Sequence, residues 1–367
     1  MDNKNYLILG GTGAMGAYLT TILAKLGGGN IYCTSRSSHV DKGNIFYLQG
    51  NAREPKFLNE VLGMKHWDAI IDFMAYSTKD FEQVYEQFLS HTEQYVFLSS
   101  SRVYAESEGP ITEDSPRLLD VCKDADYLAT DEYALAKARE ENILRASGKK
   151  NWTIIRPYIT FGDYRLQLSC EEKESWLYRC LQGKTIVFSK DLADKQTSFT
   201  YGEDVSRGIA AIVGKQEALG EAFHITNSEH HKWGEICNCY LSAIEKETGR
   251  KPKLLLTDKY EYYYGGNVPQ VKYDRLYNRE FDNSKINQFV DIKTFHPTHE
   301  ALDCCIHNFI QNPRWLPINW MYEAYKDRLT GDKDSLGVLF SHLKDIPGKR
   351  SKLKYLLVGT GLMNPPR

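Results

Sequence analysis

The sequence predicts an α/β fold in which a doubly wound parallel sheet is followed by a smaller mixed α/β domain. Short apolar stretches alternate with amphipathic ones over roughly the first 160 residues, which indicates strands joined by helices. After Gly162 the pattern becomes irregular, and helical and extended stretches of unequal length follow one another. A chain of 367 residues is long enough to form two domains.

These patterns set the expected boundaries. The first domain is expected to span residues 1–160, with 199–215 returning to it, and the second domain 161–314. An extension is expected over 315–367, with charges typical of an exposed surface. Within the second domain, residues 171–182 are expected to form a helix. The LLVGTG segment near the C-terminus predicts an edge strand or a docked tail, because too little chain follows it to build a helix.

The opening stretch predicts a strand, a tight turn and a helix in succession. An apolar run at residues 6–9 is followed by GGTGAMG at 10–16 and by an amphipathic segment at 17–26. The first N–H groups of a helix have no partner within the helix, and the helix dipole favours negative charge there. A dinucleotide pyrophosphate can therefore bind at this helix start, which predicts a Rossmann-type fold.

The glycines of this turn have separate expected tasks. Gly10 or Gly11 would make the turn, and Gly13 would let the backbone approach the phosphates. Gly16 would let the helix pack closely on its strand. A glycine pattern alone is a weak signal, and its place directly after an N-terminal apolar strand favours dinucleotide binding.

The end of the second expected strand bears on the choice of cofactor. An acidic residue at this place would bind the ribose 2′-hydroxyl of NAD, whereas an arginine with small hydroxyl neighbours suits a 2′-phosphate. Here Ser35 stands where the acid would be, and Arg36 follows. NADP is therefore favoured, and NAD stays possible because arginine can also stack on adenine.

Ligands of doubly wound sheets bind beyond the carboxyl ends of the strands, so the segments that follow the expected strands should converge on one crevice. The predicted cofactor-binding residues are Gly10, Thr12, Gly13, Ala14, Met15, Gly16, Ser35, Arg36, Asn51, Ala52, Phe73, Met74, Ala75, Tyr133, Lys137 and Pro157.

Three residues carry the predicted chemistry. Hydride transfer at a carbinol or carbonyl carbon needs a group that moves the proton of the oxygen, and a phenol does so when its pKa is brought near neutrality. Tyr133 supplies a phenol, and Lys137 follows at the i+4 position of one helical face, where an ammonium would have that effect. Ser100, after the fifth expected strand, can donate a hydrogen bond to the same oxygen.

Each of these pieces also has an ordinary structural explanation. A Tyr-x-x-x-Lys pattern arises by chance on many helices, and serines after a strand often form a turn or a cap. The glycine turn, the strand-end serine and the Tyr–Lys pair occur in the order and spacing of one active site, which favours an enzyme. The alternative is a dinucleotide-binding protein without turnover, such as a redox-sensing or RNA-associated protein.

Charge and composition exclude several other classes. Lysines and arginines number 46 against 48 acidic residues, a net charge of −2, so no nucleic-acid partner is expected. No membrane association is expected either, because the chain has no long apolar stretch and no signal peptide at its start, and we predict a cytoplasmic protein. The eight cysteines lack the spacing of a zinc site, and no metal is expected.

Six motifs support a resemblance to a known family. They are GGTGAMG at 10–16, SSSRVY at 99–104, YALAK at 133–137, RPYITFG at 156–162, SFTYGEDV at 198–205 and FDNSK at 281–285. With these motifs the chain resembles the extended short-chain dehydrogenase/reductases that act on nucleotide sugars, the epimerase/dehydratase group. The resemblance implies a Rossmann domain with bound NAD(P), a second domain that recognises a nucleotide sugar, and a homodimer. It also places the catalytic hydroxyl on Ser100.

Departures from the family pattern bear on the reaction. Members that dehydrate a sugar carry an Asp-Glu pair where this chain has Ser101 and Arg102, so dehydration is not expected. Stable 4-epimerases usually keep an acid where Ser35 stands. The resemblance therefore favours hydride transfer at C4 by an NADP-linked ketosugar reductase or dehydrogenase, with a 4-epimerase holding tightly bound NAD(P) as the alternative.

Two further departures concern binding. The family's adenine-contacting acid falls on Asn51. Its diphosphate-binding arginine falls on Thr197, so Lys272, Arg275 or Arg279 would have to bind the diphosphate of a nucleotide sugar.

Overall fold

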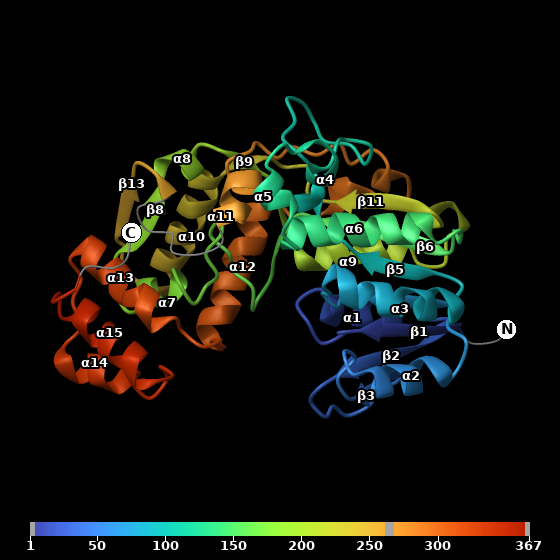
Figure 1. Ribbon diagram of the computed structural model, residues 1–367, viewed down its shortest axis with the longest axis horizontal. Helices are drawn as coiled ribbons and strands as arrows, with labels where there is room; N and C mark the ends of the chain where they lie inside the picture. The colour runs from blue at the N-terminus through green and yellow to red at the C-terminus, as the bar shows by residue number, and fades with distance from the viewer. Residues whose placement is uncertain (1–3, 261–267, 364–367) are drawn as a thin grey trace. The chain divides into compact units, whose positions relative to one another are not determined.

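The structure is a computed structural model that describes residues 4–260 and 268–363 (Figure 1). The chain divides into two compact units. Unit 1 comprises residues 1–162, 198–230 and 279–298, and unit 2 comprises 163–197, 231–278 and 299–367. Unit 1 thus includes two later segments of the chain, whereas only 199–215 was expected to return to the first domain. Residues 315–367 fall within unit 2.

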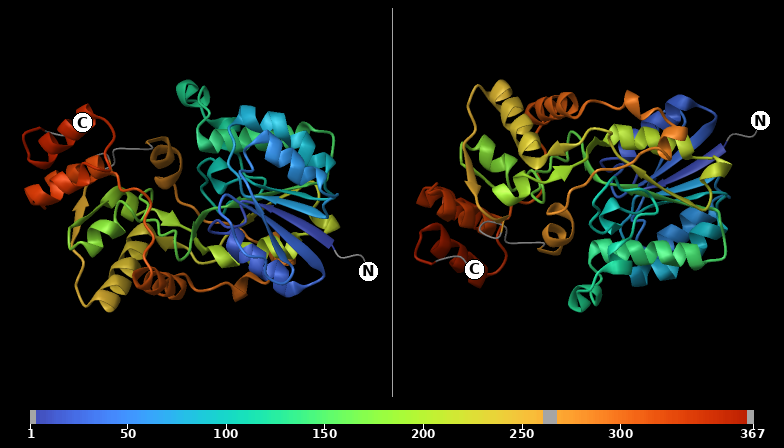
Figure 2. Two further views of the ribbon diagram at one scale, coloured as in Figure 1. Left: turned by 90° about the horizontal axis from the view of Figure 1, so that it is seen from below. Right: turned by 90° about the horizontal axis from the view of Figure 1, so that it is seen from above.

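Unit 1 contains a seven-stranded sheet in the order β3-β2-β1-β4-β5-β6-β11, seen from three sides in Figures 1 and 2. All neighbouring strands of this sheet are parallel. The strands are β1 (Lys4–Leu9), β2 (Gly29–Ser35), β3 (Ile45–Gln49), β4 (Ala69–Asp72), β5 (Tyr95–Leu98), β6 (Trp152–Pro157) and β11 (Glu221–Ile225). The predicted doubly wound parallel sheet is confirmed.

Helices cover both faces of this sheet because successive strand residues point to opposite sides. On β1, Leu7 packs with buried residues of α2, α3 and α6, whereas Ile8 packs with those of α1 and α9. These helices are α1 (Gly16–Leu26), α2 (Pro55–Gly63), α3 (Thr78–Ser90), α6 (Tyr133–Ala146) and α9 (Gly202–Ile212).

The strand order reverses between β1 and β4, and the segments that follow the carboxyl ends of the strands gather there. Short elements complete unit 1: η1 (Ser101–Val103), α4 (Leu118–Val121), α5 (Ala125–Leu128), β7 (Ile159–Phe161), β10 (Phe199–Tyr201), η2 (Gln216–Ala218), η5 (Ile286–Gln288) and η6 (Ile292–Thr294).

Unit 2 is a mixed arrangement of helices and two small two-stranded sheets. β8 (Ile186–Ser189) pairs in parallel with β13 (Leu254–Thr257), and β9 (Gln196–Thr197) pairs antiparallel with β12 (His231–Lys232). Its helices are α7 (Leu177–Leu181), α8 (Lys190–Ala193), α10 (Trp233–Thr248), α11 (Val268–Gln270), the π-helical turn η4 (Val271–Arg275), α12 (Thr298–Gln311), α13 (Trp320–Thr330), α14 (Leu336–His342) and α15 (Lys349–Gly359).

The predicted helix over residues 171–182 is wrong for its first half, since α7 covers only Leu177–Leu181. Two acids of the non-helical part are bound by distant segments. Glu171 Oε2 accepts a hydrogen bond from Lys326 Nζ at 2.7 Å, and Glu174 Oε1 accepts one from the N–H of Leu316 at 2.8 Å. Contacts with the C-terminal part of the chain therefore override the local helical preference.

The LLVGTG segment is docked, which was one of its two expected states, but it is not an edge strand, and the exclusion of a helix is wrong because α15 runs through most of the segment. Tyr355 and Val358 of α15 are buried together with Ala324 of α13 and Leu339 of α14. Apolar residues three apart give a helix a buried face. The helix begins in the lysine-rich residues before LLVGTG, whereas the prediction rested only on the short chain after that segment.

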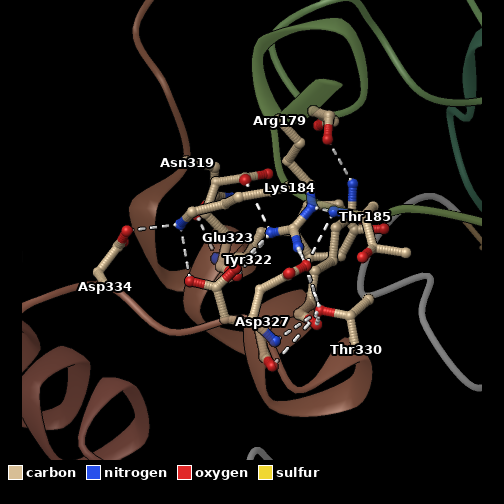
Figure 3. A network of polar contacts seen from close by, with 12 residues as sticks. Arg179, Lys184, Thr185, Asn319, Tyr322, Glu323, Asp327, Thr330 and Asp334 are labelled. Carbon is tan, nitrogen blue, oxygen red and sulfur yellow. Dashed lines mark hydrogen bonds and ion pairs between the residues drawn. The ribbon is translucent and has the colours of Figure 1, made fainter. Parts of the chain in front are cut away.

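Arg179 of α7 forms ion pairs with several acidic residues of the C-terminal segment (Figure 3). Its side chain is fully buried, and its Nη1 atom donates to Asp327 Oδ1 at 2.7 Å and to Glu323 Oε2 at 3.1 Å. Its Nη2 atom donates to Asp332 Oδ2 at 3.1 Å. The prediction of exposed charges is therefore wrong for Glu323 and Asp327, which are buried against an arginine that compensates their charge.

Arg179→Met should destabilise unit 2 by about 3–5 kcal/mol, because it leaves buried acids without their cation. The control is Arg328→Met, which changes an exposed arginine of α13 and should cost about 0.5 kcal/mol or less. Urea unfolding followed by tryptophan fluorescence measures both changes. Equal stabilities of the two variants would contradict the assigned role of Arg179.

Candidate active site

The turn after β1 brings backbone segments into close contact. Gly10 has a φ of +73°, a conformation that favours glycine, and its carbonyl oxygen accepts the N–H of Gly13 at 3.0 Å. A Cβ atom on Gly16 would lie 2.8 Å from the same oxygen, closer than a side chain can come. Only glycine fits at the start of α1, and the turn there leaves helix N–H groups available to an anion.

A cavity of about 620 Å³ lies beside this turn, a size that suits a small-molecule ligand. Eight of the residues that line it are predicted cofactor-binding residues, whereas Thr34, Gly50 and Arg53 were not anticipated. A hydroxyl at the end of β2 could have pointed to Thr34, whose Oγ1 atom accepts the N–H of Gly10 at 3.0 Å. The lining residues are Gly10, Thr12, Gly13, Thr34, Ser35, Arg36, Gly50, Asn51, Ala52, Arg53 and Met74.

Two arginines give this cavity a positive charge. Arg36 is exposed and makes no hydrogen bond or ion pair with any residue in the described ranges. Arg53 Nη2 donates to the carbonyl oxygen of Ala75 at 3.0 Å. No acidic side chain is among the described residues that line the cavity. An anionic ligand is therefore favoured here.

The other predicted cofactor-binding residues lie near the same sheet edge without lining this cavity. Ala14 and Met15 belong to the glycine turn, Phe73 and Ala75 follow β4, and Pro157 ends β6. Ala75 lines a second cavity of about 520 Å³, whose other residues come mainly from α2, α3 and their preceding segments.

Arg102 connects the predicted catalytic serine and tyrosine. Ser100 follows β5 and is the N-cap of η1. Its Oγ atom accepts a hydrogen bond from the N–H of Arg102 at 3.2 Å. The buried guanidinium of Arg102 lies 5.4 Å from the ring centroid of Tyr133 and donates to Glu132 at 2.6 Å. Tyr133 is the first residue of α6 and is 40% exposed. Ser100 thus contacts the backbone of Arg102, and Tyr133 contacts its side chain.

Lys137 lies one helical turn after Tyr133, and its ammonium is held by a buried acid. The side chain is 2% exposed, and Nζ donates to Glu140 Oε2 at 2.9 Å. The same nitrogen lies 4.5 Å from the ring centroid of Phe97 on β5. Glu140 was not predicted as a partner of Lys137, although the acid stands at i+3 on the same helix.

Two acids near Lys137 have raised pKa values. Burial raises the pKa of Asp72 to about 6, against the opposing charge of Lys137. Burial likewise raises the pKa of Glu140 to about 7, with Lys137 opposing the shift and the negative charge of Asp72 adding to it. The folded state therefore binds protons more tightly than the unfolded one. The stabilisation that these two groups contribute at low pH is lost as the pH rises through 6 to 7.

A separate buried network holds the chain around Ser100. Glu141 Oε2 accepts a hydrogen bond from Arg156 Nη2 at 2.6 Å, and its Oε1 accepts the hydroxyl of Ser99 at 2.6 Å. The hydroxyl of Ser101 donates to the carbonyl oxygen of Arg156 at 2.7 Å. Although burial opposes it, the pKa of Glu141 is lowered because Arg156 and Ser99 stabilise the carboxylate. Both neighbours of Ser100 are thus fixed to β6 or α6.

The three cations considered for a diphosphate all have contacts of their own. Arg279 is buried in unit 1 and donates to two backbone carbonyls. Arg275 is buried in unit 2 and pairs with the adjacent Asp274. The ammonium of Lys272 lies 4.7 Å from the ring centroid of Tyr273. A role toward a diphosphate stays a prediction for all three.

Residues 4–260 and 268–363 contain neither a cluster of metal ligands nor a membrane-spanning helix. Within these ranges no three His, Cys, Asp or Glu side chains are grouped so that they could hold a metal ion. The longest helix among these residues, α10, has 16 residues, and none combines the length and the apolar character needed to cross a membrane.

Residues 81–226 match the model of the NAD dependent epimerase/dehydratase family. The match covers less than half of the chain and shows that this segment is similar to the family. The matched segment runs from α3 to the residue after β11 and contains Ser100, Tyr133 and Lys137, while the glycine turn lies before it.

Two curated relatives match part of the chain. The chain is 24% identical over 243 residues to the chloroplast stem-loop binding protein of 41 kDa b from Arabidopsis thaliana. The alignment covers 62% of this chain and 60% of that protein. The chain is also 24% identical over 192 residues to the uncharacterized UDP-glucose epimerase YtcB of Bacillus subtilis, in an alignment that covers 51% and 55%. The chain thus spans less than two thirds of the length of these relatives.

Solved structures share the fold. The epimerase Mth375 of Methanothermobacter thermautotrophicus has a TM-score of 0.65 at 20% identity and covers 85% of this chain and 93% of its own. The dTDP-glucose 4,6-dehydratase of Bacillus anthracis, in complex with NAD, has a TM-score of 0.64 at 17% identity, with 85% and 98% covered. The UDP-glucuronic acid 4-epimerase of Bacillus cereus, in complex with NAD, has a TM-score of 0.62 at 16% identity, with 84% and 97% covered.

Gly16→Ala should weaken dinucleotide binding at least about tenfold and destabilise the protein by about 1–3 kcal/mol, because the added methyl group overlaps the backbone at Gly10. Gly63→Ala is the control, since a Cβ atom there meets nothing within 4 Å. Isothermal titration calorimetry with NAD and NADP, together with thermal melting, tests both variants. Wild-type affinity in Gly16→Ala would show that the turn does not hold the ligand.

Proposed function

We propose that this protein is an NAD(P)-dependent oxidoreductase that transfers hydride at C4 of a nucleotide-activated sugar. The observation that carries the proposal is the arrangement within unit 1. An anion-binding turn and a positive cavity lie at β1 and β2, and Ser100 and Tyr133 gather around Arg102 beyond β5. The family match supports hydride chemistry. The names of solved structures with the same fold, among them UDP-glucuronic acid and UDP-glucose 4-epimerases, support the substrate class.

The residues of the turn and cavity fit a nicotinamide dinucleotide. A Cβ atom on Gly13 would lie 3.3 Å from the carbonyl oxygen of Gly10, so the absence of a side chain leaves room for a phosphate. When bound, such a cofactor supplies or accepts the hydride. The backbone at Gly13 to Gly16 would hold the pyrophosphate. Arg36 and Arg53 would bind a 2′-phosphate, which favours NADP while NAD stays compatible.

The catalytic residues would handle the proton. In reduction, Tyr133 gives a proton to the sugar oxygen while Ser100 donates a hydrogen bond to the same atom. In oxidation, Tyr133 accepts that proton. A single transfer makes the protein a ketosugar reductase or dehydrogenase, which we prefer. The alternative is a 4-epimerase with tightly bound NAD(P), in which the keto sugar rotates within the site before hydride returns to its other face.

Dehydration is disfavoured by the residue that follows Ser101. Removal of water from a sugar needs an acid and a base beside the departing hydroxyl. Arg102 is instead a buried cation, and it is paired with Glu132.

A second candidate is a dinucleotide-binding protein without turnover. One matched relative is named for stem-loop binding, and in this chain the ammonium of Lys137 is paired with Glu140. The net charge of −2 argues against strong RNA binding, which depends on neutralising phosphates. The proposal also retains the expected homodimer and the expected cytoplasmic location.

Tyr133→Phe should lower kcat by about 10²–10⁴-fold, because the variant has no hydroxyl to move the proton. Its affinity for the cofactor should stay within about twofold of the wild type. Stopped-flow oxidation of NADPH and NMR detection of epimers, with UDP- and dTDP-linked sugars and 4-keto sugars, provide the measurement. Tyr85→Phe, which removes an exposed hydroxyl group from α3, is the control. Undiminished biological activity in Tyr133→Phe would favour the second candidate.

Arg36→Ser should reduce the affinity for NADP by about 10- to 100-fold and leave that for NAD nearly unchanged, since a charge-assisted hydrogen bond to the 2′-phosphate is lost. Lys25→Ser removes a cation from the last turn of α1, outside the cavity, and should change neither affinity. Calorimetric titrations with both dinucleotides make the comparison. An equal loss for NAD and NADP would assign Arg36 to adenine stacking.

A further inference from the structure

We infer that Glu140 is a positioning residue for Lys137, and that the buried acids Glu140 and Asp72, two carboxyl groups with one ammonium, bind one proton between them, so that the charge around Lys137 depends on pH. The inference rests on the proposed function, because it concerns the end of the site where Lys137 would meet the cofactor. Neither acid belongs to the motifs that carry the family resemblance.

Asp72 is fixed by donors from three directions. It ends β4 and is 1% exposed. Its Oδ1 atom accepts the N–H of Met74 at 2.9 Å, and its Oδ2 atom accepts the hydroxyls of Tyr95 at 2.8 Å and Tyr76 at 3.1 Å. Both carboxylate oxygens are therefore hydrogen-bonded, and the ionised form is the one that these donors support.

Glu140 lies in a different environment. It is fully buried on α6, and only one of its oxygens is paired: Oε2 accepts from Lys137, while Oε1 has no hydrogen-bond partner among the described residues. A buried carboxylate oxygen without a partner is costly, and a proton on that oxygen removes the charge. The shared proton therefore resides mainly on Glu140.

The charges around the pair do not balance when all groups are ionised. Asp72 and Glu140 carry two negative charges, and the ammonium of Lys137 carries one positive charge. The cluster is neutral while one proton is bound and has a charge of −1 after the proton leaves, so the two acids titrate as a coupled pair. The other groups that act on the pair or on its hydrogen-bonding tyrosines are Tyr76, Tyr95, Arg53 and Asp131.

Those surrounding groups do not remove the imbalance. Asp131 adds negative charge, and it is bound by Arg139 at 3.3 Å and by the hydroxyl of Thr78 at 2.6 Å. Arg53 acts on Tyr76 and lies at the exposed cavity. Burial raises the pKa of Asp72 to about 6 and that of Glu140 to about 7, which agrees with a proton held by the pair.

The consequence concerns the balance between oxidised and reduced cofactor. The oxidised nicotinamide ring is positively charged and the reduced ring is neutral. A new negative charge beside Lys137 would therefore stabilise the oxidised form relative to the reduced one as the pH rises. For a separation of about 10 Å and an effective dielectric constant of about 20, one charge would change this ratio of affinities by about tenfold.

The test is to measure the dissociation constants of NADP⁺ and NADPH at pH 6 and pH 8. The titration of the 2′-phosphate is common to both forms and cancels in their ratio. In the wild type, Kd(NADPH)/Kd(NADP⁺) should rise about tenfold from pH 6 to pH 8. In Glu140→Gln the ratio should change less than about twofold, because the shared proton has no site. Asp72→Asn, as a second variant, should also flatten the ratio.

The matched control is Glu171→Gln, which changes an acid of unit 2 that is likewise buried and paired with a lysine, Lys326. This variant should have a lower thermal stability, and its ratio Kd(NADPH)/Kd(NADP⁺) should still rise about tenfold from pH 6 to pH 8. A ratio in the wild type that does not depend on pH, or a rise that persists in both Glu140→Gln and Asp72→Asn, overturns the inference. Failure of the wild type to bind either form would instead contradict the proposed function, so the two failures can be told apart.

Discussion

The buried pair of Arg156 and Glu141 is the interaction on which the geometry of the candidate site depends. Arg156 ends β6 and Glu141 lies on α6, so the pair ties the helix of Tyr133 and Lys137 to the sheet. The hydroxyls of Ser99 and Ser101 join the same pair from the end of β5. Since a buried ion pair is costly to break, the segments that carry the serine and the tyrosine are held in one arrangement.

Unit 1 contains two different electrostatic environments. The cavity beside the glycine turn is lined by Arg36 and Arg53, and it suits the phosphates of a dinucleotide. Around Lys137 the interior is acidic, because Asp72 and Glu140 outnumber the ammonium. A ligand that carries anions at one end and a redox ring, cationic when oxidised, at the other matches both environments. Charge thus supports the assignment that the family match suggests.

The sequence predicted the parts of the fold that follow from local patterns. The structure shows why other parts could not be predicted. The glycine turn and the parallel strands have strong periodic or conformational signals. The first half of the helix expected over 171–182 failed because its acids bind residues about 140 or more positions away. In the site, Arg53 and Glu140 were missed because their roles depend on which strand end or helix face they meet, and one sequence does not give that information. Ser100, Tyr133 and Lys137 could be selected because their order along the chain matches a known chemistry.

The most direct measurement of the central claim is a crystal structure of the protein with NADP⁺ and a nucleotide sugar bound. The account predicts that the Tyr133 hydroxyl and Ser100 Oγ lie within hydrogen-bond distance of one sugar oxygen, with the cofactor pyrophosphate at the turn of Gly10 to Gly16. A sugar bound away from Tyr133, or a pyrophosphate away from that turn, would contradict it.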